Sequence, residues 1–277
     1  MADLNSFLKS VYRETIEDRA LGRAAELGFF LILSLFPLMI CTLSLLSFIP
    51  ASKQVALQYL SQAMPGEAMG LVRNWVDELV NQRSSAVFSF GLLFTLWSAS
   101  SGIVALMEVL NVAYEVPEES RSFFKTRVVA VLLTIALASL ILGGCVLVIY
   151  GGDLARWALL QIKSAGAYYW IGRIASYISG ALLLFAALQL TYNYGPNVDR
   201  GANKTWPGSI FGTVAILFCS YLFSIYLRFV PSYNATYGSL GAIVVLMIWL
   251  YLVGLIFMIG AEINSELMKR HRRAIPL

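Results

Sequence analysis

Three glutamates stand at the ends of long apolar segments, where carboxyl groups could exchange protons or pair with cations. Glu26 comes just before the first such segment, Glu108 just after the second, and Glu262 just after the last. Charged groups within a membrane usually face the interior of a helix bundle or a water-filled cavity, and burial raises the pKa of a carboxyl group. These glutamates are therefore candidates for a polar vestibule or for protonation sites.

Other polar and basic side chains recur near these glutamates. Ser98 and Ser101 share a helical face with Glu108 by steps of three and four, and Pro37, which has no N–H, predicts a kink in the first segment. Arginines at the same level could pair with carboxylates or attract a phosphate. The alternative is a satisfied polar network that only holds helix ends together. The candidate path or vestibule comprises Glu26, Ser34, Pro37, Ser98, Ser101, Glu108, Asn111, Arg121, Arg127, Asn197, Glu262 and Asn264.

Few residues in the chain have the types and spacing needed for catalysis or metal binding. His271 is the only histidine, and it lies in a basic tail. Cys41, Cys145 and Cys219 each fall inside an apolar segment, so their spacing fits neither a zinc site nor a disulfide framework. We therefore expect no catalytic residue, no metal and no cofactor, and we expect that the protein is not an enzyme.

The elements that must position the polar residues are long apolar helices. Hydrophobic residues make up 58% of the 277 residues and charged residues only 13%, about half the share that is usual in a soluble domain. A helix crosses the bilayer core with roughly 20 apolar residues, so the sequence predicts an all-α, polytopic membrane protein with a bundle of six transmembrane helices. The six charge-free windows are Leu27–Ile49, Ser84–Met107, Val128–Gly152, Ile174–Val198, Thr205–Leu227 and Phe229–Ala261.

The predicted organisation has three parts. Residues 1–25 form a cytoplasmic amphipathic segment, residues 26–264 the transmembrane domain, and residues 265–277 a basic cytoplasmic tail. Short amphipathic helices in the first outer loop, residues 50–83, either rest on the bilayer or cover a cavity as a lid. Gly208 and Gly212 form a GxxxG pattern, which is typical of closely packed membrane helices. The six helices are expected at about 27–49, 86–107, 128–150, 172–193, 207–228 and 240–263.

The distribution of Lys and Arg predicts the orientation of the chain in the membrane. The two termini and the even-numbered loops carry more Lys and Arg than the odd-numbered loops do. The richer side is cytoplasmic, and an even number of crossings places both termini on that side. The net charge of +4 indicates attraction to anionic lipid headgroups. We therefore expect membrane lipids as partners and no nucleic acid.

Several motifs, taken in order, are more specific than the topology. They are Ser34–Pro37, Leu96–Gly102, Leu110–Tyr114 with Arg121–Phe123, Tyr194–Asn197, Trp206–Gly208, Tyr237–Gly241, Trp249–Tyr251 and Gly260–Asn264. This set resembles the YihY/BrkB family of bacterial inner-membrane proteins over about residues 20–265. The resemblance implies a six-helix protein of the cell inner membrane. The family has carried the label ribonuclease BN and a link to serum resistance and virulence, and lipid or lipopolysaccharide transport has been proposed for relatives.

The favoured hypothesis is a protein of envelope biogenesis that assists transport or translocation of a phospholipid or a lipopolysaccharide-type lipid. In this hypothesis Pro37 and the face of Ser98 and Ser101 line the path, and Arg121 or Arg127 attracts the phosphate. Two alternatives stay open, namely a scaffold for envelope protein partners and an ion-coupled transporter of a small solute. A membrane ribonuclease is disfavoured because the chain lacks clustered His and Asp ligands and an RNA-binding module. The oligomeric state is not readable from the sequence, so a homo-oligomer also stays open.

Overall fold

The computed structural model describes residues 2–46, 85–117, 122–160, 168–198, 205–229 and 233–273, and all regular structure within them is helical. A helix is present at each of the six apolar windows, and each begins earlier or ends later than its expected range. The reason is that backbone hydrogen bonding continues into the charged residues that mark the edge of an apolar window. The helices are α1 (Ala2–Glu17), α2 (Ala20–Leu46), α5 (Ser85–Ala113), α6 (Phe123–Leu160), α7 (Tyr168–Tyr194), α8 (Trp206–Phe229) and α9 (Tyr233–Arg273).

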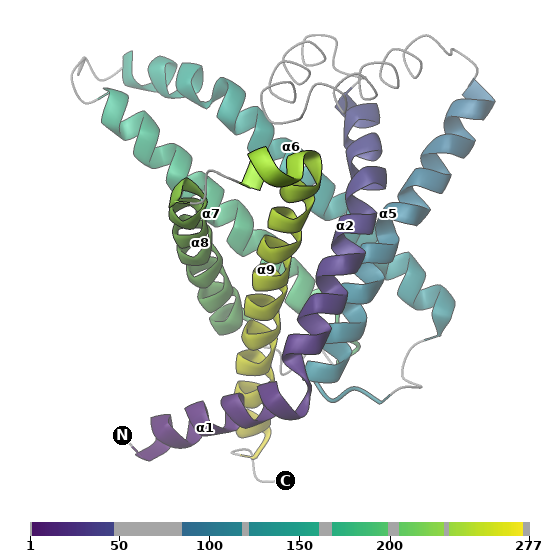
Figure 1. Cartoon of the computed structure of the whole chain (residues 1–277), viewed down its shortest axis with the longest axis vertical. Coiled ribbons are helices and arrows are strands. Elements are labelled where there is room, and N and C mark those ends of the chain that lie inside the picture. Colours follow the sequence, from purple (N-terminus) through teal and green to yellow (C-terminus); the bar gives the residue numbers. More distant parts are fainter. Residues whose placement is uncertain are drawn as a thin grey trace.

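Six of these helices pack in a closed ring. α2 contacts both α5 and α9, and the ring continues from α5 to α6, α7, α8 and back to α9. α1 crosses the end of α9 that carries the C-terminus (Figure 1). The described chain therefore begins and ends at the same end of the bundle, which is called the terminal end below.

The bundle buries several hydroxyl side chains within its apolar core and exposes many large apolar side chains. Buried polar residues between the helices include Ser100, Thr134, Thr191, Ser209 and Thr213. Large apolar side chains that point outward include Leu132, Ile135, Leu182, Val214, Leu217, Phe218 and Leu222. Such a surface suits contact with lipid, because soluble monomers rarely expose large apolar patches.

Among the described residues, four helical segments are long and apolar enough to cross a membrane. They are Leu96–Ala113, Phe123–Gly144, Trp206–Leu227 and Val244–Arg273. The protein is therefore a membrane protein with several candidate spans. α9 also ends in basic residues from Arg270 to Arg273, which suit the negative end of the helix dipole.

A tight turn joins α1 to α2 and brings Asp18 to the bundle. Arg19 has a φ of 50°, in the left-handed region, and its N–H donates to the carbonyl oxygen of Ile16 at 3.0 Å. A left-handed residue commonly ends a helix in this way. Nε of Arg23 then donates to the carbonyl oxygen of Asp18 at 3.1 Å, which satisfies an acceptor just past the end of α1. The turn therefore sets the direction of α1 and the position of Asp18.

A very close contact joins the N-terminal turn of α8 to α9. A Cβ atom on Gly208 would collide with the carbonyl oxygen of Gly260 and with the Asn264 side chain. The N–H of Gly208, which has no partner within its own helix, donates to Oδ1 of Asn264 at 2.7 Å. Thr205 precedes α8, and its hydroxyl accepts a hydrogen bond from Nε2 of Gln189 on α7 at 2.8 Å. α7, α8 and α9 are thus held together at the terminal end.

Tyr192 also ties α7 to α9. Its hydroxyl donates to the carbonyl oxygen of Phe257 at 2.8 Å, and the two rings stack with centroids 4.8 Å apart. Tyr192→Phe removes only the hydrogen bond, so we expect the free energy of unfolding to fall by about 1 kcal/mol. Thermal unfolding in detergent measures this loss, with Tyr221→Phe, an exposed position on α8, as the control. An unchanged Tm for Tyr192→Phe would contradict the contact.

Candidate functional site

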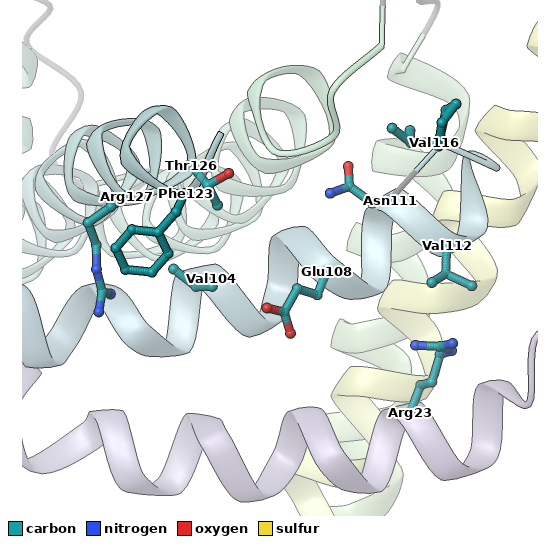
Figure 2. A pocket seen from close by; sticks show the side chains of 10 residues that line it. Arg23, Val104, Glu108, Asn111, Val112, Val116, Phe123, Thr126 and Arg127 are labelled. Atoms are coloured by element: carbon teal, nitrogen blue, oxygen red, sulfur yellow. The ribbon is translucent and has the colours of Figure 1, made fainter. Parts of the chain in front are cut away.

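A pocket of ≈ 470 Å³ lies between α2, α5 and the N-terminal part of α6 (Figure 2). Its volume is in the range of small-molecule sites. The side chain of Phe123 forms part of the wall and is 75% exposed, so the pocket reaches the molecular surface beside the start of α6. Val104 and Val112 of α5 supply an apolar lining. The pocket therefore has an apolar wall and an opening at the end of a membrane helix.

Arg127 is held in the wall of this pocket by α5. Its Nη1 donates to the hydroxyls of Ser100 at 3.0 Å and Ser101 at 3.2 Å. The guanidinium carbon lies 3.9 Å from the centroid of the Trp97 ring, and such stacking fixes the plane of the group. Nε of Arg127 is buried and has no hydrogen-bond partner among the described residues. Arg127 is thus a cation whose position in the pocket wall is fixed by α5.

Arg23 and Glu108 are the other two charged residues that line the pocket. Figure 2 shows Glu108 on α5 between the level of Arg127 and that of Arg23. Two positive charges and one negative charge leave the pocket with a net charge of +1. Within the described part of the chain, no carboxylate forms an ion pair with Arg127. An amphiphilic anion therefore fits both the charge and the apolar wall.

A second polar cluster surrounds Glu262 on α9. Glu262 is only 1% exposed, and its carboxyl group lies within hydrogen-bonding reach of the Asp18 carboxyl. Burial is the main cause that raises the pKa of Asp18, and the nearby Glu14 carboxylate raises it further. The hydrogen bond from Glu262 and the positive charge of Arg23 lower this pKa, but by less. Two carboxyl groups can share a hydrogen bond only when one of them carries a proton.

Several buried polar atoms near Glu262 have no hydrogen-bond partner among the described residues. Burial raises the pKa of Tyr114 above its usual value, so its hydroxyl stays protonated, facing the Asn264 amide without hydrogen-bond geometry. An unpartnered buried polar group costs about 1–3 kcal/mol, so a cluster of them requires an explanation such as a bound ligand or water. The unpartnered atoms are Oε1 of Glu262, Nδ2 of Asn264, Oγ of Ser265 and the hydroxyl of Tyr114.

Ion pairs surround this cluster at the terminal end. Nζ of Lys269 lies 2.8 Å from Oε1 of Glu115 and 3.8 Å from Oε2 of Glu14. Nε of Arg270 lies 2.7 Å from Oε1 of Glu266 on the same helix. Partly exposed pairs of this kind contribute only about 0–1 kcal/mol each. They therefore position α1, the end of α5 and α9 relative to one another more than they stabilise the fold.

The predicted site residues fall into two groups rather than one. Glu108, Asn111 and Arg127 line the pocket, and Ser101 joins them through its hydrogen bond with Arg127. Oδ1 of Asn111 accepts a hydrogen bond from the N–H of Asn197 at 3.0 Å, which ties the segment after α7 to the pocket wall. Glu262 and Asn264 belong instead to the buried cluster on α9. Ser98 is half-buried on α5 and is not part of the pocket lining.

Of the remaining predicted residues, only Glu26 has a described side chain, and it joins neither group. The side chain of Glu26 is exposed on α2, while its neighbours Ala24 and Leu27 are buried, so Glu26 lies on the outward face of that helix. α2 is helical through Ser34 and Pro37, but their side chains lie outside the described part of the structure. Arg121 also lies outside the described residues.

The sequence pattern does not point to Asp18, Tyr114 or Ser265. Their roles depend on contacts between segments far apart in the chain, and none of them interrupts an apolar window. The residues that hold Arg127 could have been found from the sequence. Trp97 and Ser101 are spaced by one helical turn, so they lie on one face of a helix. In the part of the chain that the structure describes, no group of three or more His, Cys, Asp or Glu side chains is placed to hold a metal ion.

These features define the class of the protein as a helical membrane protein with several candidate spans and a polar terminal end. A family model described as virulence factor BrkB matches residues 11–276. The chain therefore belongs to the BrkB family, which confirms the resemblance seen in its motifs.

Similar proteins occur in several bacteria. YfkH of Bacillus subtilis (strain 168), named as ribonuclease-like, is 36% identical over 267 residues, which are 96% of this chain and 97% of that protein. The UPF0761 membrane protein of Coxiella burnetii (strain RSA 493 / Nine Mile phase I) is 25% identical over 266 residues, 93% of this chain and 91% of that protein. The UPF0761 membrane protein Bxeno_A3061 of Paraburkholderia xenovorans (strain LB400) is 26% identical over 261 residues, 91% of this chain and 57% of that protein. No solved structure matches the chain.

Proposed function

We propose that the protein assists the transport or translocation of a phosphate-bearing lipid, of the phospholipid or lipopolysaccharide type, during envelope biogenesis in the bacterial inner membrane. In this proposal it is not an enzyme, it crosses the membrane six times, and both termini are cytoplasmic. The terminal end of the bundle, with its pocket, then faces the cytoplasmic leaflet.

The observation that carries the proposal is the pocket around Arg127. Its net positive charge, its apolar wall and the guanidinium of Arg127 together suit a phosphate attached to an acyl chain. Arg is well matched to phosphate because its planar guanidinium presents several donors at once. A soluble anion would have no use for the apolar wall, whereas a lipid would use both parts.

The arrangement of the helices supports a role in moving such a headgroup. A charged group is costly in hydrocarbon, so a lipid crosses the bilayer faster when polar side chains replace water around its headgroup. Hydroxyl side chains are buried between the helices, while apolar side chains cover the outside. The headgroup would follow these buried hydroxyl side chains, and the acyl chains would remain against the apolar outer surface.

Filling the pocket is expected to slow lipid movement. Val112 lines the pocket, and Figure 2 shows its side chain on α5 near Arg23 of α2. Val112→Trp would occupy the space that the headgroup needs. In vesicles of phosphatidylethanolamine and phosphatidylglycerol containing the full chain, we expect translocation of fluorescent phosphatidylglycerol to slow by about ten-fold or more.

Val214→Trp is the matched control, because Val214 is 63% exposed on the outer face of α8 and away from the pocket. It adds the same ring to the same residue type and should leave the rate unchanged. Equal rates in the wild type, in Val112→Trp and in protein-free vesicles would contradict lipid translocation. RNA cleavage by the purified protein, or uptake of a small solute into the same vesicles, would instead support one of the alternatives.

A further inference from the structure

The α1–α2 turn meets α9 through a pair of acidic side chains. The carboxyl groups of Asp18 and Glu262 lie within hydrogen-bonding reach, and Glu262 is almost fully buried. We propose that Asp18 and Glu262 form a proton-binding site that joins the α1–α2 turn to α9 only while a proton is bound. The proposal is independent of the lipid that the protein handles.

A proton is the ligand that the contact requires. Two ionised carboxylates repel at this distance, whereas one carboxylic acid donates a hydrogen bond to the other carboxylate. The nearby cations are engaged elsewhere, since Arg23 donates to the backbone carbonyl of Asp18 and Lys269 pairs with Glu115. The charged or titratable groups around the pair are Glu14 on α1, Arg23 on α2, Tyr114 and Glu115 after α5, and Glu266 and Lys269 on α9.

A second observation points to the same place. Oγ of Ser265 is fully buried, has no partner among the described residues, and lies one turn along α9 from Glu262 on the same face. Oε1 of Glu262 is also unpartnered. If Glu262 were a structural carboxylate held in an ion pair, both of its oxygens would accept hydrogen bonds. The unpartnered Oε1 of Glu262 and Oγ of Ser265 instead suit a carboxyl group that gains and loses a proton.

The sign of the pH effect follows from the pKa of Asp18. Burial raises this pKa above its usual 3.8, so as pH rises past 3.8 the unfolded chain loses its proton while the folded protein still holds one. By linkage, the contact between the α1–α2 turn and α9 therefore weakens as pH rises, until the proton has left the folded protein. Loss of the proton places two negative charges together next to Glu14, and we expect the α1–α2 turn to separate from α9.

Infrared titration of the full chain tests the site directly. In a detergent without ester groups, the carbonyl stretch of a protonated carboxyl group is resolved from the bands of carboxylates. We expect the wild type to show a buried carboxylic acid that persists to neutral pH and disappears at higher pH. Glu262→Gln, which keeps the shape of the protonated acid, should lack this band. Glu17→Gln, at an exposed position of α1, should retain it.

Hydrogen exchange of residues 18–23, expressed as protection factors, tests the link to the turn. We expect protection to fall in the wild type over the pH range in which the infrared band disappears, and to be independent of pH in Glu262→Gln. Asp18→Asn removes one carboxyl group and should likewise abolish the pH dependence, so it serves if Glu262→Gln does not fold. A wild type without the band, a band that survives in Glu262→Gln, or protection that ignores pH in the wild type would overturn the proposal.

Discussion

Gly208→Ala is expected to destabilise the bundle more than a Gly→Ala substitution at any other described glycine. A Cβ atom there meets the backbone carbonyl of Gly260, which cannot move without shifting α9, and also meets the Asn264 side chain. The shift would break the 2.7 Å hydrogen bond from the Gly208 N–H to Oδ1 of Asn264. Overpacking of this kind costs about 1–3 kcal/mol, and the lost hydrogen bond adds about 1 kcal/mol.

Thermal unfolding of Gly208→Ala in detergent, followed by circular dichroism, measures this effect. Gly180→Ala is the matched control, because Gly180 lies within α7 and a Cβ atom there has no atom within 4 Å. Alanine also favours helix over glycine by about 1 kcal/mol, so Gly180→Ala should leave Tm unchanged or raise it. A Tm for Gly208→Ala equal to that of Gly180→Ala would show that the α8–α9 contact is looser than described.

The class of the fold is predictable from the sequence because charge is excluded from hydrocarbon. The charge-free windows locate the long helices α2 and α5–α9 of the described residues, and the GxxxG pattern at Gly208 correctly indicates close helix packing. The partner helix could not be predicted. Nothing in the local sequence says that Gly208 faces Gly260 rather than a glycine of another helix, since the pairing is decided by the packing of the whole ring.

The candidate site could be predicted only in part. Glu26, Glu108 and Glu262 stand at similar positions on their helices, but the rotation of each helix about its axis decides where the side chain points. The structure leaves Glu26 exposed, places Glu108 in the pocket, and buries Glu262 against Asp18. A turn residue such as Asp18 carries no periodic signal, so its contact with Glu262 emerges only from the left-handed backbone at Arg19.

Arg127→Lys is expected to weaken the binding of an anionic lipid by about ten- to one hundred-fold. The change keeps the positive charge but loses the planar group that stacks 3.9 Å from the Trp97 ring centroid and bonds both Ser100 and Ser101. A hydrogen bond to a charged group is worth about 1.5–3 kcal/mol, and each 1.4 kcal/mol is ten-fold in affinity. A lysine ammonium cannot keep these contacts and also reach a phosphate, so binding should fall although the charge is conserved.

Titration of the detergent-solubilised protein with short-chain phosphatidylglycerol, followed by intrinsic tryptophan fluorescence, measures this affinity. Lys125→Gln is the matched control, because Lys125 lies on the same helix, is exposed and is not part of the pocket lining. Removing its charge should change the affinity by less than about two-fold, since exposed charges are strongly screened by salt. An equal loss in Lys125→Gln would mean that general surface charge attracts the lipid. Unchanged affinity in Arg127→Lys, with an unchanged Tm, would mean that the headgroup does not bind at Arg127.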